Sequence, residues 1–308
     1  MDKLEYAPIV VFAFNRLEPL KACIASLQVN NESKDSDLFV FVDGPRQHKE
    51  GEMEKVQNVR DFVKKINGFK SLTYRFTEKN MGLAKSIICG TSEIINHYGK
   101  VIVLEDDLIV APTFLSYINM MLEAYKDNDH IMQISGYSAK IRNTHKYNCD
   151  YYLSGRAHSW SWATWENRWN TVDWDVKDYD EINSSRKMQK SFCKYGSDLF
   201  KMLKGWHDGK NSSWYIRFNY SMHKQGKYCI APIKSLVIND GFKEGATHTA
   251  VYNRYKVSFN SDPNYQWNIN PYLEWDEHLA KEAVRYWSVP YRIYGKIVTF
   301  LIPLSWNK

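Results

Sequence analysis

Short apolar runs alternate with amphipathic segments through the first hundred residues, and this alternation limits the folds open to the chain. The apolar runs have the length of buried strands and lie at 8–14, 38–42, 72–76 and 101–104. Segments with helical periodicity separate them, at 17–27, 56–66 and 82–98. Strands that alternate with helices in this way are typical of a parallel, Rossmann-like sheet. We therefore predict an α/β fold with a mostly parallel central sheet flanked by helices.

Polar residues follow each predicted strand at the point where it ends. They are Asn15-Arg16, Asp43-Gly44, Lys79-Asn80 and Glu105-Asp106-Asp107. In parallel sheets, ligands bind beyond the carboxyl ends of the strands. We expect these residues to meet at one rim of the sheet and to form a binding site there.

The sequence "VIVLEDDLIV" (101–110) places three carboxylates between two apolar runs. Repulsion between like charges and loss of hydration both oppose such a cluster at the end of a core strand. A divalent cation removes this difficulty, because Mg²⁺ or Mn²⁺ at a diphosphate is usually held by one or two carboxylates plus phosphate oxygens. The triplet therefore predicts a metal site for a diphosphate ligand.

With "LEDDL" (104–108) as a DXD-type motif, the chain resembles nucleotide-sugar-dependent glycosyltransferases of the GT-A fold. It is similar to the N-acetylglucosaminyltransferase I type and to related bacterial sugar transferases. The resemblance covers most of residues 6–250. Four further segments carry it, in the family's order: "FAFNR" (12–16), "FVDGP" (41–45), "EKNMGLAKS" (78–86) and "GFKEGATHT" (241–249).

The resemblance implies a hexosyltransferase that moves a sugar from a nucleotide diphosphate donor, a UDP-sugar, to a saccharide acceptor. It implies an inverting, metal-dependent reaction with Mn²⁺ or Mg²⁺, in the assembly of a surface polysaccharide or oligosaccharide.

The resemblance also assigns roles to residues. Asp107 would be a direct metal ligand, with His248 at the pyrophosphate and metal. Glu105 would act near the donor sugar or the acceptor hydroxyls. The implied nucleotide contacts are Phe14, Asn15, Arg16, Asp43, Asn80, Leu83 and Asp106.

The catalytic base is where the chain departs from the resemblance. Related enzymes place an Asp just before a Trp that begins an acceptor-side helix, but the matching stretch "GKNSSWYIRF" (209–218) has Ser212 and Ser213 there. A base must take the proton of the acceptor hydroxyl. Asp208 is the nearest carboxylate and our predicted base, and Glu166 and Asp240 are further options.

Five tryptophans crowd into residues 160–174. Trp162, Trp165 and Trp169 have the spacing of one helical face, which predicts a place in the core. Trp160 lies beside His158 and Ser159, and it is the better candidate for stacking on a sugar.

We predict a GT-A domain over residues 1–250, with a nucleotide-sugar-binding half at 1–130 and an acceptor-side half at 131–250. A C-terminal helical extension would follow at 251–308. Its last part, "VPYRIYGKIVTFLIPLSWNK" (289–308), predicts an amphipathic helix with a narrow cationic face. Such a helix suits the surface of an anionic membrane and an acceptor that is lipid-linked. The alternative is a helix packed on the protein's own core or on a partner subunit.

Composition bounds the remaining possibilities. The five cysteines form no CxxC pair, and the N-terminus lacks the apolar core of a signal peptide, so we expect the cytoplasm, including the inner face of the membrane. The formal charge of +6 suits an anionic ligand, but no basic-aromatic motif indicates nucleic acid.

A sugar nucleotidyltransferase would need a glycine-rich loop where the chain reads "FNRLEPL". A carbohydrate-binding protein or inactive scaffold would not explain the acidic triplet.

Overall fold

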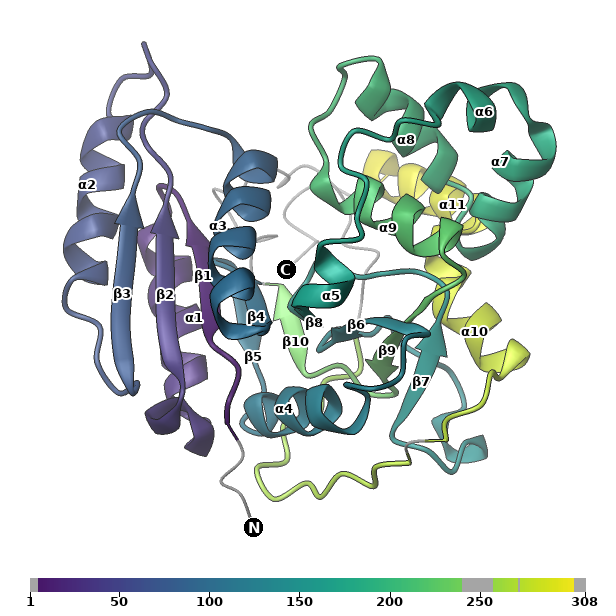
Figure 1. The fold of residues 1–308 in the computed structure, drawn as a ribbon, viewed down its shortest axis with the longest axis horizontal. Coiled ribbons are helices and arrows are strands. Elements are labelled where there is room, and N and C mark those ends of the chain that lie inside the picture. Colours follow the sequence, from purple (N-terminus) through teal and green to yellow (C-terminus); the bar gives the residue numbers. More distant parts are fainter. Residues whose placement is uncertain (1–4, 240–256, 271, 302–308) are drawn as a thin grey trace.

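A computed structural model of the chain describes residues 5–239, 257–270 and 272–301 (Figure 1). An eight-stranded sheet forms its centre, in the order β3-β2-β1-β4-β8-β6-β9-β7. Its strands are β1 (Ile9–Ala13), β2 (Asp37–Val42), β3 (Ser71–Phe76), β4 (Lys100–Glu105), β6 (Ile131–Ser135), β7 (Tyr151–Ser154), β8 (Trp162–Trp165) and β9 (Tyr228–Pro232). Neighbours pair in parallel except at β8 and β7, which run antiparallel to the strands beside them. The prediction of a mostly parallel central sheet is confirmed.

Helices cover both faces of the sheet and make three layers (Figure 1). One face packs against α1 (Leu17–Gln28), α2 (Glu52–Val63) and α4 (Phe114–Ala124), and the other against α3 (Leu83–Tyr98), α5 (Glu166–Trp169) and α9 (Trp214–Lys224). Alternate residues of a strand point to opposite faces. In β1, Ile9 and Val11 therefore belong to the first core and Val10 and Phe12 to the second.

The tryptophan stretch lies in the core, as predicted, but not on one helical face. Trp162 and Trp165 are the two ends of β8, and only Trp169 is helical. Three positions apart on a strand, Trp162 and Trp165 point to opposite faces, so each enters a different core. Trp162 stacks on Trp169, with 5.4 Å between ring centroids. The expectation of a single helix through 162–169 was wrong because its i, i+3, i+7 spacing also fits a strand followed by a turn of helix.

Smaller elements surround this frame. Helices α6 (Tyr179–Ser184), α7 (Arg186–Phe192) and α8 (Leu199–His207) pack with α9 around a separate apolar cluster. Strands β5 (Leu108–Val110) and β10 (Val237–Asn239) form an antiparallel pair directly after the acidic triplet. Short 3₁₀ turns occur at Asn31–Asp35, Thr144–Lys146 and Cys193–Tyr195.

The C-terminal part contains α10 (Glu277–Val284), a 3₁₀ turn at Arg285–Trp287, and α11 (Val289–Leu301), so the predicted C-terminal helix is present. Residues 302–308 of the predicted amphipathic segment lie outside the described residues. In the portions of the chain that are described, no helix combines the length and apolar character needed to cross a membrane.

Candidate active site

The carboxyl ends of β1 and β4 meet where the strand order reverses, because β1 lies between β2 and β4. Ligands of parallel α/β sheets bind at this kind of switch point. Arg16, three residues beyond β1, donates through Nη2 to a carboxylate oxygen of Asp106 and, at 3.0 Å, to Oδ2 of Asp107. Polar residues from two strand ends, ninety positions apart in the sequence, are therefore in direct contact.

Negative charge is concentrated around this contact. The side chain of Asp106 is 5% exposed and that of Asp107 is 13% exposed. Burial raises the pKa of Asp106 to about 6, although pairing with Arg16 acts in the opposite direction. Burial also raises the pKa of Glu105, and the charges of Asp107 and Asp106 add to this effect. Arg16 thus compensates only part of the charge, so a second cation at this edge would be stabilised.

A cavity of about 820 Å³, which we call the strand-end cavity, opens beyond these strand ends. All the predicted nucleotide contacts and the whole acidic triplet line it: Phe14, Asn15, Arg16, Asp43, Asn80, Leu83, Glu105, Asp106 and Asp107. The structure therefore brings together every predicted residue of the nucleotide side that it describes.

Asp43 supports the turn after β2 and also connects it to a distant loop. Its carboxylate accepts hydrogen bonds from the backbone N–H groups of Gly44, Met81 and Gly82, at 2.9 Å each, and from the hydroxyl of Thr77. It joins the loop after β2 to the segment that leads into α3. The two loops lie so close that a Cβ on Gly44 would stand 2.6 Å from backbone of Lys79.

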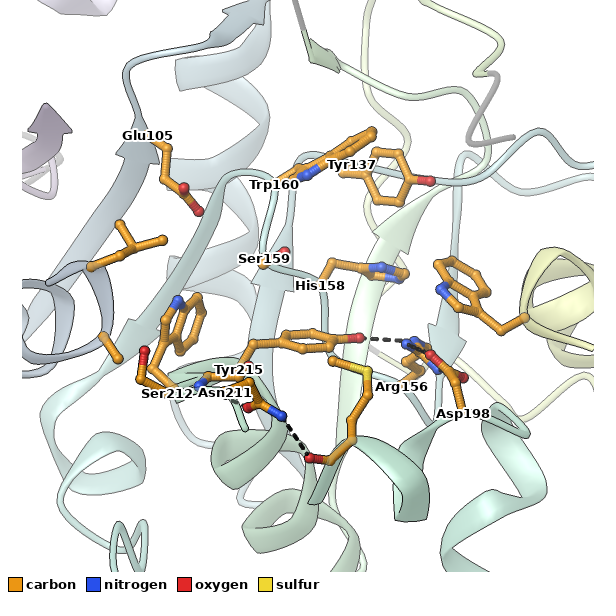
Figure 2. Close-up of a pocket in the computed structure, with 16 residues that line it drawn as sticks. Glu105, Tyr137, Arg156, His158, Ser159, Trp160, Asp198, Asn211, Ser212 and Tyr215 are labelled. Carbon is orange, nitrogen blue, oxygen red and sulfur yellow. Dashed lines mark hydrogen bonds and ion pairs between the residues drawn. The ribbon is translucent and has the colours of Figure 1, made fainter. Parts of the chain in front are cut away.

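A second cavity of about 710 Å³, which we call the aromatic cavity, adjoins the first. Glu105, Leu83, Ser159 and Trp160 line both cavities. Figure 2 shows Glu105 on one side of the aromatic cavity, Trp160 and Tyr137 above it, and Arg156 and Asp198 on the far side. Trp160, our sequence candidate for a sugar contact, thus stands at the boundary of the two cavities, as does Glu105.

The predicted catalytic base lies elsewhere. Asp208 ends α8, forms ion pairs with Lys204 and Lys210, and is absent from the described lining of both cavities. The hydrogen bond from Lys210 and the charge of Lys204 lower the pKa of Asp208. Glu166, at the start of α5, also lines neither cavity. Asp240 and His248 lie outside the described residues.

Several lining residues were not found from the sequence. Lys49 and Lys55 reach the strand-end cavity from the loop after β2 and from α2, together with Arg46. Basic and acidic residues alternate in this segment, so the sequence offered no clear signal for them. Ser212 and Ser213, named above from the sequence, line the aromatic cavity. Trp287 comes from far along the chain, and no local pattern marks it.

A divalent cation fits the chemistry of this edge. The oxygens of Asp106 and Asp107 are hard ligands of the kind that Mg²⁺ and Mn²⁺ prefer. Nδ2 of Asn239 donates to Oδ1 of Asp107 at 3.4 Å. Within the described ranges, no group of three or more His, Cys, Asp or Glu is arranged to hold a metal ion. An ion that binds at a diphosphate needs only one or two protein carboxylates. The residues therefore fit a metal that binds together with a nucleotide.

Comparison with known proteins gives one family match. A family model described as glycosyl transferase family 2 matches residues 9–189, more than half of the chain. No curated protein matches the sequence.

Solved structures that are similar to the chain include three at low sequence identity. The first is the mannosyltransferase PcManGT from Pyrobaculum calidifontis in complex with GDP-Man and Mn²⁺, at 12% identity over 72% of this chain and 70% of that chain, with a TM-score of 0.39. The second is a UDP-glucose pyrophosphorylase complexed with UDP-glucose, at 11% identity over 73% and 90%, with a TM-score of 0.35. The third is S. aureus TarS, at 15% identity over 42% and 21%, with a TM-score of 0.28.

Proposed function

Because the chain belongs to glycosyl transferase family 2, we propose that it transfers a sugar from a nucleotide diphosphate donor in the strand-end cavity to a saccharide acceptor in the aromatic cavity. The family makes the protein a glycosyltransferase. We propose a UDP-sugar as the donor, and Mn²⁺ or Mg²⁺ as the metal.

One observation carries this proposal: Glu105 lines both cavities. The strand-end cavity also brings basic side chains, such as Lys49 and Lys55, to the acidic triplet. Transfer requires that the donor's anomeric carbon and the acceptor's hydroxyl meet. The boundary marked by Glu105 and Trp160 is the place where two ligands, one in each cavity, can approach each other.

Residues of the strand-end cavity would bind and orient the donor. Asp107 would hold the metal at the diphosphate, and Arg16 can pass from the two aspartates to the phosphate oxygens. A bound divalent cation would supply Lewis-acid stabilisation of the leaving nucleoside diphosphate. Lys49 and Lys55 add positive charge to the same cavity, which favours an anionic ligand.

In this proposal Glu105, which lines both cavities, accepts the proton of the acceptor hydroxyl. A base works best when its pKa lies near the working pH, and the burial and neighbouring charges that raise the pKa of Glu105 act in that direction. A base on the acceptor side, opposite the leaving diphosphate, gives a single displacement with inversion at the anomeric carbon. Asp208 remains the alternative base if the end of α8 moves towards the acceptor.

We expect UDP and Mn²⁺ together to raise the melting temperature of the protein by several degrees. A ligand at 100 times its dissociation constant adds about 2.7 kcal/mol to the free energy of unfolding. Differential scanning fluorimetry with UDP, GDP and ADP, each with Mn²⁺ or with EDTA, measures the shift. A panel of UDP-sugars and product analysis then identify the donor. Absence of any shift with all three nucleotides would contradict the proposed function.

We further propose that the domain division follows the two cavities. Residues 1–130 supply most of the strand-end cavity, residues 131–250 supply most of the aromatic cavity, and the extension 251–308 adds Trp287. In this view the enzyme acts in the cytoplasm at the inner face of the membrane, on a lipid-linked acceptor in surface polysaccharide or oligosaccharide assembly.

Helix α11 supports a membrane contact. One side of the helix packs on the protein through the buried Gly295 and Val298. Another side leaves Ile293, Ile297 and Phe300 exposed, at 53%, 50% and 89% of their surface. An exposed apolar row beside basic side chains is typical of a helix that lies in the interface of an anionic membrane.

The double variant Ile293→Asp/Ile297→Asp should lose binding to anionic vesicles, because carboxylates replace apolar side chains at the interface. The unaltered chain should sediment with phosphatidylglycerol-containing liposomes, and less so at high salt. A control with two exposed apolar residues elsewhere, Val29→Asp/Met53→Asp, should bind like the unaltered chain. Equal binding by all three proteins, or binding by none, would rule out α11 as the membrane contact.

A further inference from the structure

The aromatic cavity holds one polar group that the proposed function does not use. The imidazole of His158 lines the cavity and is 4% exposed, and its Nε2 has no hydrogen-bond partner among the described residues. A buried polar atom without a partner is unfavourable, so a ligand that supplies one is favoured. Figure 2 shows this imidazole in the middle of the cavity lining, below Tyr137 and above Tyr215.

The position of His158 is tightly held. Its backbone N–H donates to Oε1 of Gln133 at 2.8 Å, and Nε2 of Gln133 donates back to its carbonyl at 3.1 Å. The ring of Tyr137 stands edge-on to the imidazole at 5.2 Å between centroids, and that of Trp287 lies at 6.0 Å. The hydrogen bonds fix the backbone of His158, and the two rings confine its imidazole. The imidazole therefore loses little freedom when it binds a ligand.

The imidazole is also neutral. Burial is the main cause that lowers the pKa of His158, to about 3, and the charge of Arg156 contributes. A neutral imidazole offers one N–H donor and one acceptor nitrogen, and either suits a hydroxyl group. It offers no positive charge to an anion.

The charged residues of the cavity also give no advantage to an anionic ligand. Arg156 pairs with both oxygens of Asp198, at 2.9 and 3.0 Å, and donates to the hydroxyl of Tyr215 at 2.8 Å. Its guanidinium also lies 4.5 Å from the ring of Trp287. Arg156 is the cation in the described lining, and Asp198 already engages its charge. An anionic sugar would therefore gain little from it.

Building on the proposed function, we propose that the aromatic cavity selects an uncharged sugar unit of the acceptor, and that Nε2 of His158 hydrogen-bonds one of its hydroxyls. The rings of Trp160 and Tyr137 supply apolar faces for the sugar's C–H groups. Because Nε2 is covered in the free protein, the sugar reaches it after a small shift of the side chains around it.

The test compares neutral and charged acceptors with the donor that the nucleotide-sugar panel identifies. The neutral probes are the methyl glycosides of glucose, galactose and N-acetylglucosamine, and the charged probes are glucuronic acid and glucose 6-phosphate. Product formation is followed by mass spectrometry, and release of the nucleoside diphosphate reports turnover. We expect transfer to at least one neutral probe and none to the charged pair.

Variants then test His158 itself. His158→Phe should raise the KM for the neutral acceptor tenfold or more, while the KM for the donor changes less than twofold. His158→Gln, which keeps a hydrogen-bonding group, should recover part of the loss. His223→Phe is the control. His223 lies on α9, is half-buried against Phe192, and lines neither cavity in the described lining.

The outcomes separate this inference from the proposed function. Transfer to the charged probes alone, or to no probe while the donor is still hydrolysed, would overturn the inference and leave the glycosyltransferase intact. An unchanged acceptor KM in His158→Phe would also overturn it, because the imidazole would then make no contact with the acceptor. If no nucleotide sugar is bound or hydrolysed, the proposed donor site itself is wrong. Should His158→Phe fail to fold, His158→Gln and the acceptor panel still decide.

Discussion

Replacing Asp107 with alanine is expected to lower the rate of sugar transfer by at least about 10³-fold, about 4 kcal/mol of transition-state stabilisation. Asp107 lines the strand-end cavity, and its side chain is more exposed than that of Asp106. Without it, the metal would lose its protein ligand at the diphosphate. Transfer from the donor, followed as nucleoside diphosphate release, measures the loss.

The fold should survive this change. The ion pair that Asp107 forms with Arg16 is partly exposed and contributes about 1 kcal/mol at most, and removing one of three clustered carboxylates relieves repulsion. We therefore expect a nearly unchanged melting temperature in EDTA, together with loss of the stabilisation by UDP and Mn²⁺. Asp61→Ala, on α2, is the matched control on an exposed carboxylate that lines neither cavity. Full activity of Asp107→Ala, or of the unaltered enzyme in excess EDTA, would exclude this role.

The strand-end cavity was largely predictable because its residues belong to local patterns. A strand has to end before its chain can turn, and in a parallel sheet the ends share one edge, so Arg16 and Asp107 could be placed together from the order of elements alone. Lys49 and Lys55 were missed because they come from a loop and a helix surface, where polar residues carry no periodic signal. The bonds that Asp43 accepts from the backbone of Met81 and Gly82 could not be predicted, since those groups lie 38 and 39 positions away.

The aromatic cavity was much less predictable. Trp160 could be singled out by its polar neighbours, but the contacts of His158 depend on Gln133 and Trp287, which are distant in sequence. Trp162 and Trp165 were expected in the core, and they are, but the spacing of bulky residues did not distinguish a helix from a strand. Packing between distant elements decides such positions, and a single sequence does not contain that information.

The base is the second large effect, and two single variants decide between its candidates. Glu105→Gln should lower turnover by 10²–10⁴-fold, the usual contribution of a general base. Asp208→Asn should stay near the unaltered rate, because Asp208 lines neither cavity and is paired with lysines. Glutamine keeps the shape of the side chain, so UDP with Mn²⁺ should still stabilise Glu105→Gln. If Asp208→Asn were slow and Glu105→Gln were near the unaltered rate, Asp208 would be the base. A product that retains the donor's anomeric configuration would exclude a single displacement.

Stability gives an independent check on the role of Glu105. Its pKa in the folded protein is raised above the ordinary value of 4.5, so the ionised side chain opposes folding. This penalty is absent below the unfolded pKa and grows as the pH rises from there towards the folded pKa. In EDTA and without nucleotide, Glu105→Gln should therefore melt at a higher temperature than the unaltered chain at pH 7, and at a similar temperature at pH 4. A variant that is more stable yet inactive would show that the chain keeps an unfavourable, partly buried carboxylate for the sake of the reaction. A lower melting temperature at pH 7 would instead make Glu105 a structural residue.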